Sequence, residues 1–236
     1  MKCIILAGGY GTRLAEETKI KPKPLVKIGN RPIIWHLMKI YSFYGIKNFI
    51  ICTGYKGDLL KKEVNLLNRT EKWNIKYVNT GLKTMTGGRI KRIKKYLNKD
   101  DNFFCLSYGD GLSDVNIDKL IQFHKRNKKI VTLTAVKYKN PKGILKININ
   151  SKISAIKEKP IEYINGGFFV LSKKIFKFLK NDKTIFEKNC LPKLVKKKQV
   201  MAYKHNGFWA CMDTIREKQE LNKIWKSKQK AWKIWI

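Results

Sequence analysis

Acidic residues are few in this chain of 236 residues: 17 Asp and Glu stand against 52 Lys and Arg, and the formal net charge is +35 at pH 7. Arginine is scarce as well, because only seven of the 52 cations are Arg. Clustered cations are typical of nucleic-acid binding. Here the lysines are spread over nearly every segment together with many Asn and Ile residues, and all three residue types have codons rich in A and T. Biased codon usage therefore explains much of the charge, and binding of polyanions is a secondary consequence or the alternative.

Long apolar runs are also missing from the sequence. No stretch reaches the ~20 apolar residues that a membrane-spanning helix needs. A mean hydropathy of −0.39 and 43% hydrophobic residues exclude a membrane bundle and a disordered tail. The apolar run at the N-terminus ends at Gly8, which makes it too short for a signal peptide. These features predict a soluble, cytoplasmic protein that does not act at a membrane.

Residues that bind transition metals are sparse. The five cysteines contain no C-x-x-C pair, and Cys3, Cys52 and Cys105 lie within apolar runs where a thiol acts as a small hydrophobic group. The three histidines are isolated from one another, and no H-E-x-x-H motif occurs. The sequence therefore predicts a reducing compartment and no zinc site.

Short apolar runs alternate with helical patterns along the chain. The runs that predict strands cover residues 2–7, 48–52, 74–78, 103–108, 130–136, 143–149, 153–157, 166–171 and 200–205. The patterns that predict helices cover residues 32–44, 58–68, 88–97, 117–125, 173–180, 186–197 and 214–225. Alternation of this kind predicts an α/β fold: a Rossmann-like open, mixed and mainly parallel sheet with helices on both faces. No linker or internal repeat divides the chain, so a single domain over residues 1–236 is expected.

A glycine-rich loop, Gly8-Gly9-Tyr10-Gly11-Thr12-Arg13, directly follows the first predicted strand. Ligands of open α/β sheets lie at the carboxyl ends of strands, where glycines allow backbone N–H groups to approach phosphate oxygens. The loop lacks the third glycine of the dinucleotide fingerprint, and the chain has no P-loop motif. A tight turn explains the glycines alone, whereas phosphate binding also explains Thr12 and Arg13.

The segment Lys21-Pro22-Lys23-Pro24 begins ten residues after Gly11. The prolines favour an extended backbone, in which one lysine points into the site and the other toward solvent. A solvated loop is the alternative interpretation. Beside Arg13, a lysine from this segment adds a second cation near a triphosphate.

Two acidic residues follow strand-like runs. Asp110 lies between two glycines at the end of the run 103–108, and Asp213 lies between the run 207–212 and the last predicted helix. At the carboxyl end of a strand, a carboxylate is well placed to hold Mg²⁺, which binds one or two carboxylates together with phosphate oxygens. The alternatives are a simple turn for Asp110 and a helix N-cap for Asp213.

Taken together, these segments resemble the sugar-1-phosphate nucleotidyltransferases, from Met1 to the tryptophan-rich end. The resemblance is carried by residues 6–14, 16–18, 21–24, 84–89, 108–111, 158–160, 165–169, 212–214 and 232–235. The Glu16-Glu17-Thr18 continuation, Met85-Thr86-Gly87-Gly88-Arg89 and the Trp232-Lys233-Ile234-Trp235 ending are typical of the branch that transfers a cytidylyl group.

The resemblance implies the nucleotide-diphospho-sugar transferase fold, with a nucleotide-binding half over about residues 1–140 and a sugar-phosphate-binding part over about 141–236. It implies transfer of a cytidylyl group from CTP to α-D-glucose 1-phosphate, giving CDP-glucose and pyrophosphate, a step toward the deoxysugars of surface polysaccharides such as O-antigen. It also implies Mg²⁺ as cofactor and a homo-oligomer. A relative that uses UTP or dTTP, and a polyanion-binding module with a vestigial nucleotide site, are the alternatives.

Site residues are implied by the same motifs. The implied nucleotide-binding residues are Leu6, Ala7, Gly8, Gly9, Gly11, Thr12, Arg13, Lys23, Thr84, Arg89 and Gly109. The implied catalytic residues are Arg13, Lys23 and Asp110, and the implied Mg²⁺ ligands are Asp110 and Asp213. The implied sugar-phosphate-binding residues are Glu158, Lys159, Asn165 and Gly167.

The chain departs from the family pattern in three places. Residues 57–73 form a much shorter segment than is usual there, where family members carry an insertion near subunit contacts. Ala210-Cys211 stands where Gln-Pro is usual, and Ala231 replaces a proline before the terminal motif. Oligomer geometry and one wall of the nucleotide site are the features that these departures affect.

Overall fold

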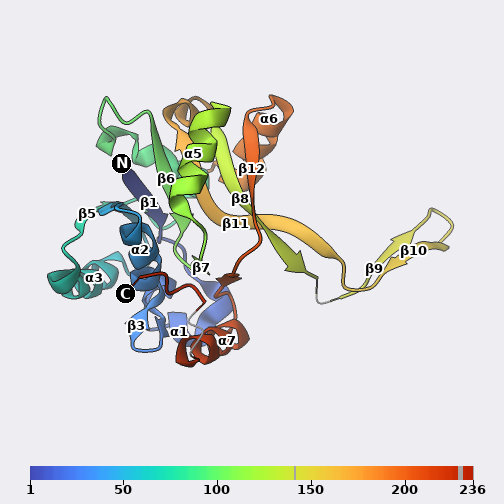
Figure 1. The fold of residues 1–236 in the computed structure, drawn as a ribbon, viewed down its shortest axis with the longest axis horizontal. Coiled ribbons are helices and arrows are strands. Elements are labelled where there is room, and N and C mark those ends of the chain that lie inside the picture. The colour runs from blue at the N-terminus through green and yellow to red at the C-terminus, as the bar shows by residue number, and fades with distance from the viewer. Residues whose placement is uncertain (141, 228–230, 236) are drawn as a thin grey trace.

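The computed structural model describes residues 1–140, 142–227 and 231–235, and a seven-stranded sheet forms its centre (Figure 1). Across the sheet the strands follow the order β12-β8-β11-β6-β1-β4-β5. Their bounds are β1 Lys2–Leu6, β4 Asn48–Thr53, β5 Asn74–Asn79, β6 Phe103–Tyr108, β8 Val131–Lys139, β11 Ile161–Ser172 and β12 Val200–His205. β1 is parallel to β4 and β6, β4 to β5, and β8 to β12, whereas β11 is antiparallel to both of its neighbours. This arrangement confirms the predicted mixed, mainly parallel sheet.

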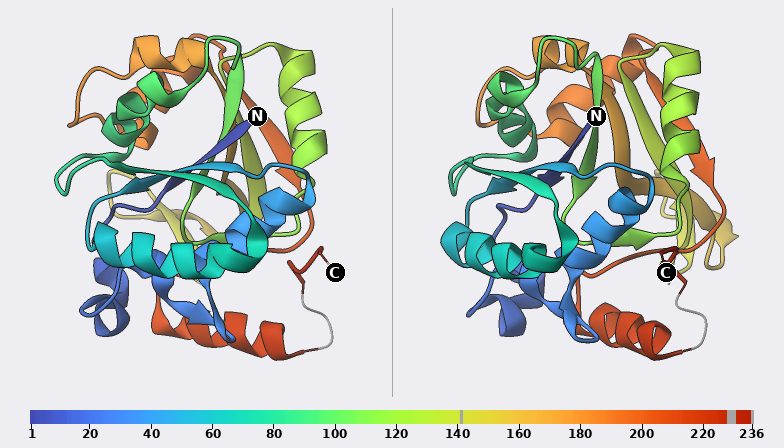
Figure 2. Two further views of the ribbon diagram at one scale, coloured as in Figure 1. Left: turned by 90° about the vertical axis from the view of Figure 1, so that its left-hand side faces the viewer. Right: turned by 60° about the vertical axis from the view of Figure 1, so that its left-hand side comes forward.

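Helices cover both faces of the sheet, as the sequence predicts (Figure 2). Successive side chains of a strand point to opposite faces, and in β1 Cys3 and Ile5 belong to one apolar cluster while Ile4 belongs to the other. The first cluster takes side chains from α2 (Ile33–Phe43), α3 (Gly57–Glu71) and α5 (Ile117–Asn127). The second takes side chains from α4 (Thr86–Arg92) and α6 (Leu191–Lys196).

Local sequence signals set the ends of several helices. Pro32 directly precedes α2, and Gly45 stops that helix with a φ of +74°, a conformation that favours glycine. Asn116 caps α5 because its side chain accepts a hydrogen bond from the Lys119 N–H group. The shortened segment forms a single helix, α3, that leads directly into β5.

Several predicted elements differ in detail from the observed ones. The predicted helix 88–97 is α4 followed by a 3₁₀ turn at Lys94–Tyr96, and the predicted helix 173–180 is a 3₁₀ segment at Lys173–Phe178. The predicted helix 186–197 begins with a π-helical turn at Phe186–Cys190 before α6. Three short strands were not predicted, namely β2 (Lys27–Ile28), its partner β3 (Arg31–Pro32) and β7 (Gly111–Ser113), whereas β13 (Trp209–Cys211), which pairs with β7, lies within the strand-like run 207–212. Strands of two or three residues are too short to show the alternation that predicts a strand.

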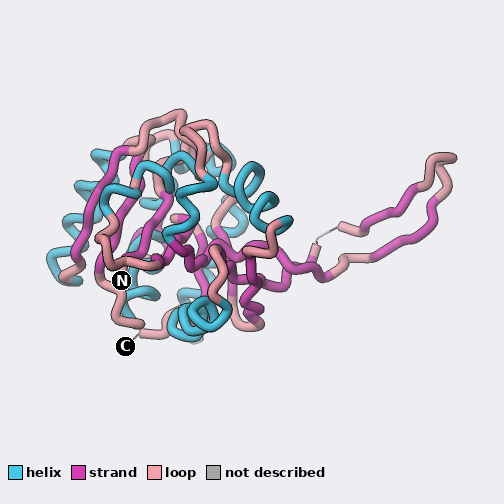
Figure 3. The backbone as a smooth tube through the Cα atoms, turned by 90° about the horizontal axis from the view of Figure 1, so that it is seen from above, coloured by secondary structure: helices cyan, strands magenta, loops and turns pink. Residues whose placement is uncertain are grey.

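A two-stranded arm projects from the body beyond β8 and β11 (Figures 1 and 3). The arm consists of β9 (Ile144–Ile147) and β10 (Ile153–Lys157), which pair in antiparallel fashion. Its apolar side chains are largely exposed, and Ile149 is fully so.

The C-terminal part packs against β2 and α2. α7 (Ile215–Lys226) lies beside β2, and Trp232 is fully buried against Phe208, Trp225 and His36. Within the described ranges, no helix is long and apolar enough to span a membrane.

Candidate active site

The pairing of β1 with β6 brings the glycine loop and Asp110 to one edge of the sheet. Leu6, the last residue of β1, is in register with Tyr108, the last residue of β6, and the Gly109 N–H group donates to the Leu6 carbonyl at 3.1 Å. The loop after β1 and the turn after β6 therefore begin side by side, at the strand ends where such sheets bind ligands. An open cavity of about 1060 Å³ lies there and is lined by both segments.

Close contacts with the Arg89 side chain and the Thr53 backbone explain the first glycine of the loop. A Cβ atom on Gly8 would lie 2.0 Å from the Arg89 guanidinium and 2.9 Å from the Thr53 carbonyl oxygen, so a side chain does not fit there. Gly11 has a φ of +69°, and its carbonyl accepts hydrogen bonds from Leu14 N–H and the Thr18 hydroxyl. The loop is thus held in a fixed conformation that leaves Gly9 open toward the cavity.

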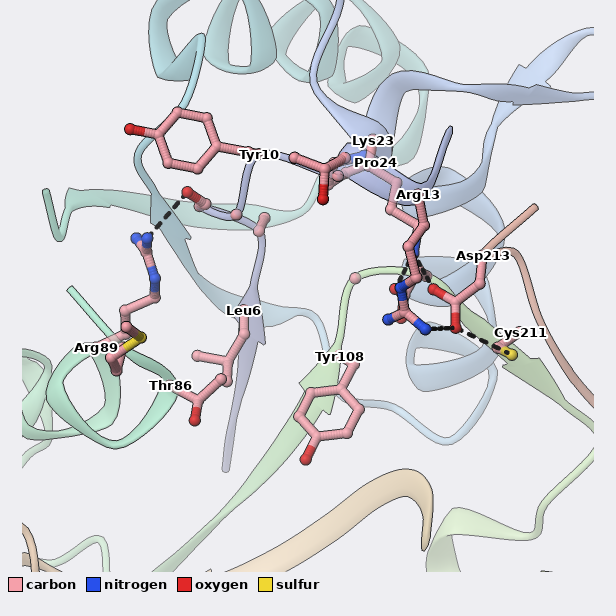
Figure 4. A pocket seen from close by; sticks show the side chains of 18 of the residues that line it. Leu6, Tyr10, Arg13, Lys23, Pro24, Thr86, Arg89, Tyr108, Cys211 and Asp213 are labelled. Carbon is pink, nitrogen blue, oxygen red and sulfur yellow. Dashed lines mark hydrogen bonds and ion pairs between the residues drawn. The ribbon is translucent and has the colours of Figure 1, made fainter. Parts of the chain in front are cut away.

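Arg89 supports this loop from behind. Its guanidinium donates to the Gly8 carbonyl at 2.9 Å, the Thr53 carbonyl at 3.2 Å and the Thr80 hydroxyl at 2.5 Å, and only 5% of the residue is exposed. Burial lowers the pKa of Arg89 from its ordinary value. Arg89 lines the cavity (Figure 4), but these donors are engaged with the protein. Arg89 therefore fixes the shape of the loop.

Lys23 points into the site from a 3₁₀ turn. The segment 21–24 differs from the extended form that the prolines predict: Pro22 is extended, but Lys23–Leu25 form one 3₁₀ turn with Pro24 in its first positions. Lys21 instead forms an ion pair with Glu17 at 2.8 Å. As predicted, one lysine faces the site and the other does not, but the backbone that orients them forms a turn and is not extended throughout.

The Lys23 ammonium group lies between two carboxylates. Its Nζ atom is 2.6 Å from Asp110 Oδ2 and 2.6 Å from Asp213 Oδ1. Burial alone lowers the pKa of Lys23, but the charges and hydrogen bonds of Asp110 and Asp213 outweigh it, so the pKa is raised. Arg13 completes the group at 2.8 Å from Asp213 Oδ2 (Figure 4), with most of its side chain exposed. Two anions and two cations therefore meet at one end of the cavity.

A short antiparallel pair holds the two aspartates together. Gly111 of β7 is in register with Cys211 of β13, and the Met212 N–H group donates to the Asp110 carbonyl at 3.0 Å. Because Asp110 directly precedes β7 and Asp213 lies two residues after the end of β13, residues 103 positions apart in sequence come into contact with the same lysine.

The N-cap of α7 is Thr214, which leaves the Asp213 side chain available to the site. The Thr214 hydroxyl accepts from the Glu217 N–H group, and the Glu217 carboxylate accepts from the Thr214 N–H group, forming a capping box. The Asp213 N–H group also donates to Glu217, at 2.6 Å. Glu217 thus fixes the backbone from which Asp213 reaches Lys23.

The donor set fits a divalent magnesium ion. Oxygen atoms of Asp110 and Asp213 converge on one cationic group, the ammonium of Lys23, which shows that a positive charge is accommodated between them. Within the part of the chain that the structure describes, no group of three or more His, Cys, Asp or Glu residues is arranged to hold a metal. Mg²⁺ is commonly bound by one or two carboxylates, and oxygen atoms of phosphate and water fill its remaining coordination positions.

The other predicted residues divide into two groups. Thr84, Gly109 and Asn165 line the cavity, as do all the predicted residues from Leu6 to Arg13. Glu158 and Lys159 lie beside the β9–β10 arm, where both side chains are more than half exposed, and do not line the cavity. Gly167 has a φ of +79° and contacts Asn165 and Ser107 behind the cavity wall. Asp110, Asp213, Lys23 and Arg13 are therefore brought together, whereas Glu158 and Lys159 are not.

Several residues of the cavity wall were not predicted as site residues. They are Tyr10, Pro24, Leu82, Lys83, Met85, Thr86, Tyr108, Ile164, Glu187, Trp209 and Cys211. Tyr108 lies within the motif 108–111 and Cys211 directly precedes the motif 212–214, and these positions were the available signal. Glu187 lies in a segment with no motif, so only the folded structure reveals its position.

The fold and the site together define a class of protein. A mainly parallel α/β sheet whose glycine loop, lysine and paired carboxylates surround a cavity is suited to the transfer of nucleotidyl groups. The model of the family described as nucleotidyl transferase matches residues 2–226, and the chain belongs to this family.

Particular relatives agree with the motifs. The chain is 44% identical to the glucose-1-phosphate cytidylyltransferase of Salmonella typhimurium and 40% identical to the probable glucose-1-phosphate cytidylyltransferase of Bacillus subtilis, over the full length of each. A crystal structure of HddC from Yersinia pseudotuberculosis complexed with GMP-PN has a TM-score of 0.75 at 25% identity, covering 95% of this chain and 99% of that one. The resemblance predicted from the motifs is thereby confirmed.

Proposed function

We propose that this chain transfers a cytidylyl group from CTP to glucose 1-phosphate, giving CDP-glucose and pyrophosphate. The observation that carries the type of reaction is the Lys23 ammonium group held between Asp110 and Asp213, with Arg13 beside it, at the edge of a glycine loop. Identity of 40–44% over the full chain to proteins named glucose-1-phosphate cytidylyltransferases supports the two substrates.

The chemistry needs positioning and positive charge more than a protein nucleophile. An oxygen of the sugar phosphate attacks the α-phosphorus of CTP, a new P–O bond forms, and the bond to the departing pyrophosphate breaks. The attacking phosphate is already ionised, so no general base is required. Both reactants are anions, and the cations of Arg13 and Lys23 offset their repulsion and the charge that develops on pyrophosphate.

Mg²⁺ is the cofactor that we infer for this site. Asp110 and Asp213 would hold it, and when bound it supplies further positive charge to the reacting phosphates. The glycine loop, with Thr84 and Gly109, would hold the nucleotide. Asn165 lines the cavity and would bind the sugar phosphate.

We also infer a homo-oligomer. The support is the β9–β10 arm, a two-stranded hairpin outside the body that exposes Ile147, Ile149 and Ile156. An isolated hairpin is marginally stable in water, so burial of this surface by a second copy would stabilise it. Light scattering on purified protein gives the mass, and a monomer at micromolar concentration would exclude this part of the proposal. Use of the product in surface-polysaccharide synthesis stays a prediction.

The test of the proposed function is pyrophosphate release from glucose 1-phosphate and each of CTP, UTP, dTTP, ATP and GTP in the presence of Mg²⁺. CTP is expected to give the highest kcat/KM, and a chelator is expected to abolish the signal. Equal turnover with UTP or dTTP would show that the chain has a different nucleotide specificity. No turnover with any nucleotide, together with salt-sensitive binding of nucleic acid, would favour the polyanion-binding alternative.

A further inference from the structure

Glu187 is a carboxylate of the cavity wall that the reaction as described does not use. The cavity is lined by three acidic residues in a chain that has only 17, namely Asp110, Glu187 and Asp213. Asp110 and Asp213 meet the Lys23 ammonium group. Glu187 belongs to the π-helical turn before α6 and is held by two hydroxyl groups.

Both carboxylate oxygens of Glu187 accept one hydrogen bond from a hydroxyl group. The Thr86 hydroxyl donates to Oε2 at 2.7 Å, and the Tyr108 hydroxyl donates to Oε1. Thr86 is oriented in turn, because its oxygen accepts from the Phe186 N–H group at 2.9 Å. The Asn165 amide donates to the Tyr108 oxygen at 3.3 Å. The carboxylate is therefore fixed by α4, by β6 and by its own turn.

The chemistry of the carboxylate defines what it can bind. An ionised carboxylate has about four acceptor positions, and two of them are taken by Thr86 and Tyr108. The remaining positions require donors, and the negative charge repels phosphate groups. Hydroxyl groups of a neutral sugar supply donors without charge.

Position distinguishes the sugar from the nucleotide. Tyr108 is the last residue of β6 and directly precedes Gly109 and Asp110. Asn165, which donates a hydrogen bond to Tyr108, comes from β11, and β11 and β1 lie on opposite sides of β6. In Figure 4 Thr86 lies on the side of the cavity away from Asp213, Arg13 and Lys23, with Arg89 on the same side as Thr86, and Tyr108 lies between Thr86 and Arg13. A sugar seated here extends its phosphate toward Lys23 and keeps its hydroxyl groups at Glu187.

We propose that the Glu187 carboxylate binds hydroxyl groups of the sugar in the sugar 1-phosphate, with Thr86 and Tyr108 as the residues that position it. The inference rests on the proposed function and names the part of the cavity that selects the sugar. A site built to bind a hydroxyl group rejects an analogue that lacks it.

The first test is Glu187→Gln, which keeps the shape of the side chain and removes its charge. The KM for glucose 1-phosphate is expected to rise about ten-fold or more, while the KM for CTP stays within about two-fold. The wild-type preference for glucose 1-phosphate over its monodeoxy analogues is expected to shrink in the same variant. Glu162→Gln, an exposed acid of β11 outside the cavity lining, is the matched control and should leave both constants unchanged.

A second test separates positioning from folding. Tyr108→Phe and Thr86→Val each remove one hydroxyl partner and are expected to raise the KM for glucose 1-phosphate by several-fold, and Thr86→Ser should restore it. Thermal melts of every variant report whether the fold is kept. Should Thr86→Val fail to fold, Tyr108→Phe and Glu187→Gln carry the test.

The outcomes distinguish this inference from the function on which it rests. A wild-type protein that releases no pyrophosphate overturns both. An active wild type with an unchanged KM for glucose 1-phosphate in Glu187→Gln, or with the change confined to CTP, overturns the assignment of Glu187 alone.

Discussion

At the scale of single residues, Lys23 pairs with two carboxylates and also lines the cavity. In the structure its ammonium group neutralises Asp110 and Asp213, which would otherwise place two like charges side by side. The same cation faces the cavity in which the triphosphate would lie. Because the pKa of Lys23 is raised, its ammonium group keeps its positive charge throughout the neutral pH range and loses that charge only in strong alkali.

Removal of this charge should be costly for activity. Lys23→Met is expected to lower kcat/KM about 100-fold, because a buried cation at the reacting phosphates acts where water screens little. Pyrophosphate release measures the effect. Lys21→Met, from the same Lys-Pro-Lys-Pro segment, removes only the ion pair with Glu17 and should keep nearly full activity. Equal losses in the two variants would show that the segment matters only for its fold.

The sequence predicted part of the site because some residue types carry a local signal. Glycines after a strand, a lysine between prolines and aspartates after strands are visible without a structure, and the structure places Gly8, Lys23, Asp110 and Asp213 around one cavity. Glu187 carries no such signal, since its neighbours Thr86 and Tyr108 lie 101 and 79 positions away.

At the scale of elements, the start of α7 fixes the second aspartate. Thr214→Ala removes the side-chain cap and is expected to lower the free energy of unfolding by about 1 kcal/mol. Because Asp213 directly precedes the cap, kcat/KM should also fall by several-fold. Denaturant unfolding and pyrophosphate release measure the two effects. Thr214→Ser keeps the hydroxyl group and serves as the control, and a loss of the same size in both variants would argue against the cap.

Two buried histidines make the helices α2 and α5 sensitive to acid. Burial lowers the pKa of His36 and of His124 to about 4, from an ordinary value of 6.5. Between these values the unfolded chain takes up protons that the folded chain does not, so stability falls as the pH drops from about 6.5 to 4. Each histidine should remove roughly 2–3 kcal/mol by pH 4.5.

The measurement is the free energy of unfolding in denaturant at pH 7 and at pH 4.5. His36→Gln and His124→Gln should each show a smaller difference between the two pH values than the wild type does. A wild-type stability that is unchanged at pH 4.5 would contradict the lowered pKa values.

Helices and strands were predictable where they are long enough to show a repeating pattern of apolar residues. The strands of the parallel half and helices α2, α5 and α7 follow the apolar pattern closely, because each buries one face or both. The outer part of β11 extends beyond its predicted start because it pairs with β8 as far as Lys139, where side chains are exposed and carry no apolar signal. Tertiary contacts, not local pattern, decide such ends.

At the scale of the whole molecule, the site exists only after the chain has folded. Lys23 reaches Asp110 and Asp213 across 87 and 190 positions of sequence. The parallel pairing of β1 with β6 and the antiparallel pairing of β7 with β13 make this contact possible. Alternation of strands and helices predicts the sheet, but the register of β7 and β13 follows from the three-dimensional path of the chain.

The most direct measurement is the rate of pyrophosphate release from CTP and glucose 1-phosphate by wild type, Asp110→Asn and Asp213→Asn, each titrated with Mg²⁺. Both substitutions keep the size of the side chain and remove one negative charge. The wild type is expected to be active, and each variant should lose about 2–3 kcal/mol of transition-state stabilisation, roughly 50-fold in kcat/KM, and need more Mg²⁺. Full activity of either folded variant at the wild-type Mg²⁺ concentration would contradict the paired-carboxylate site.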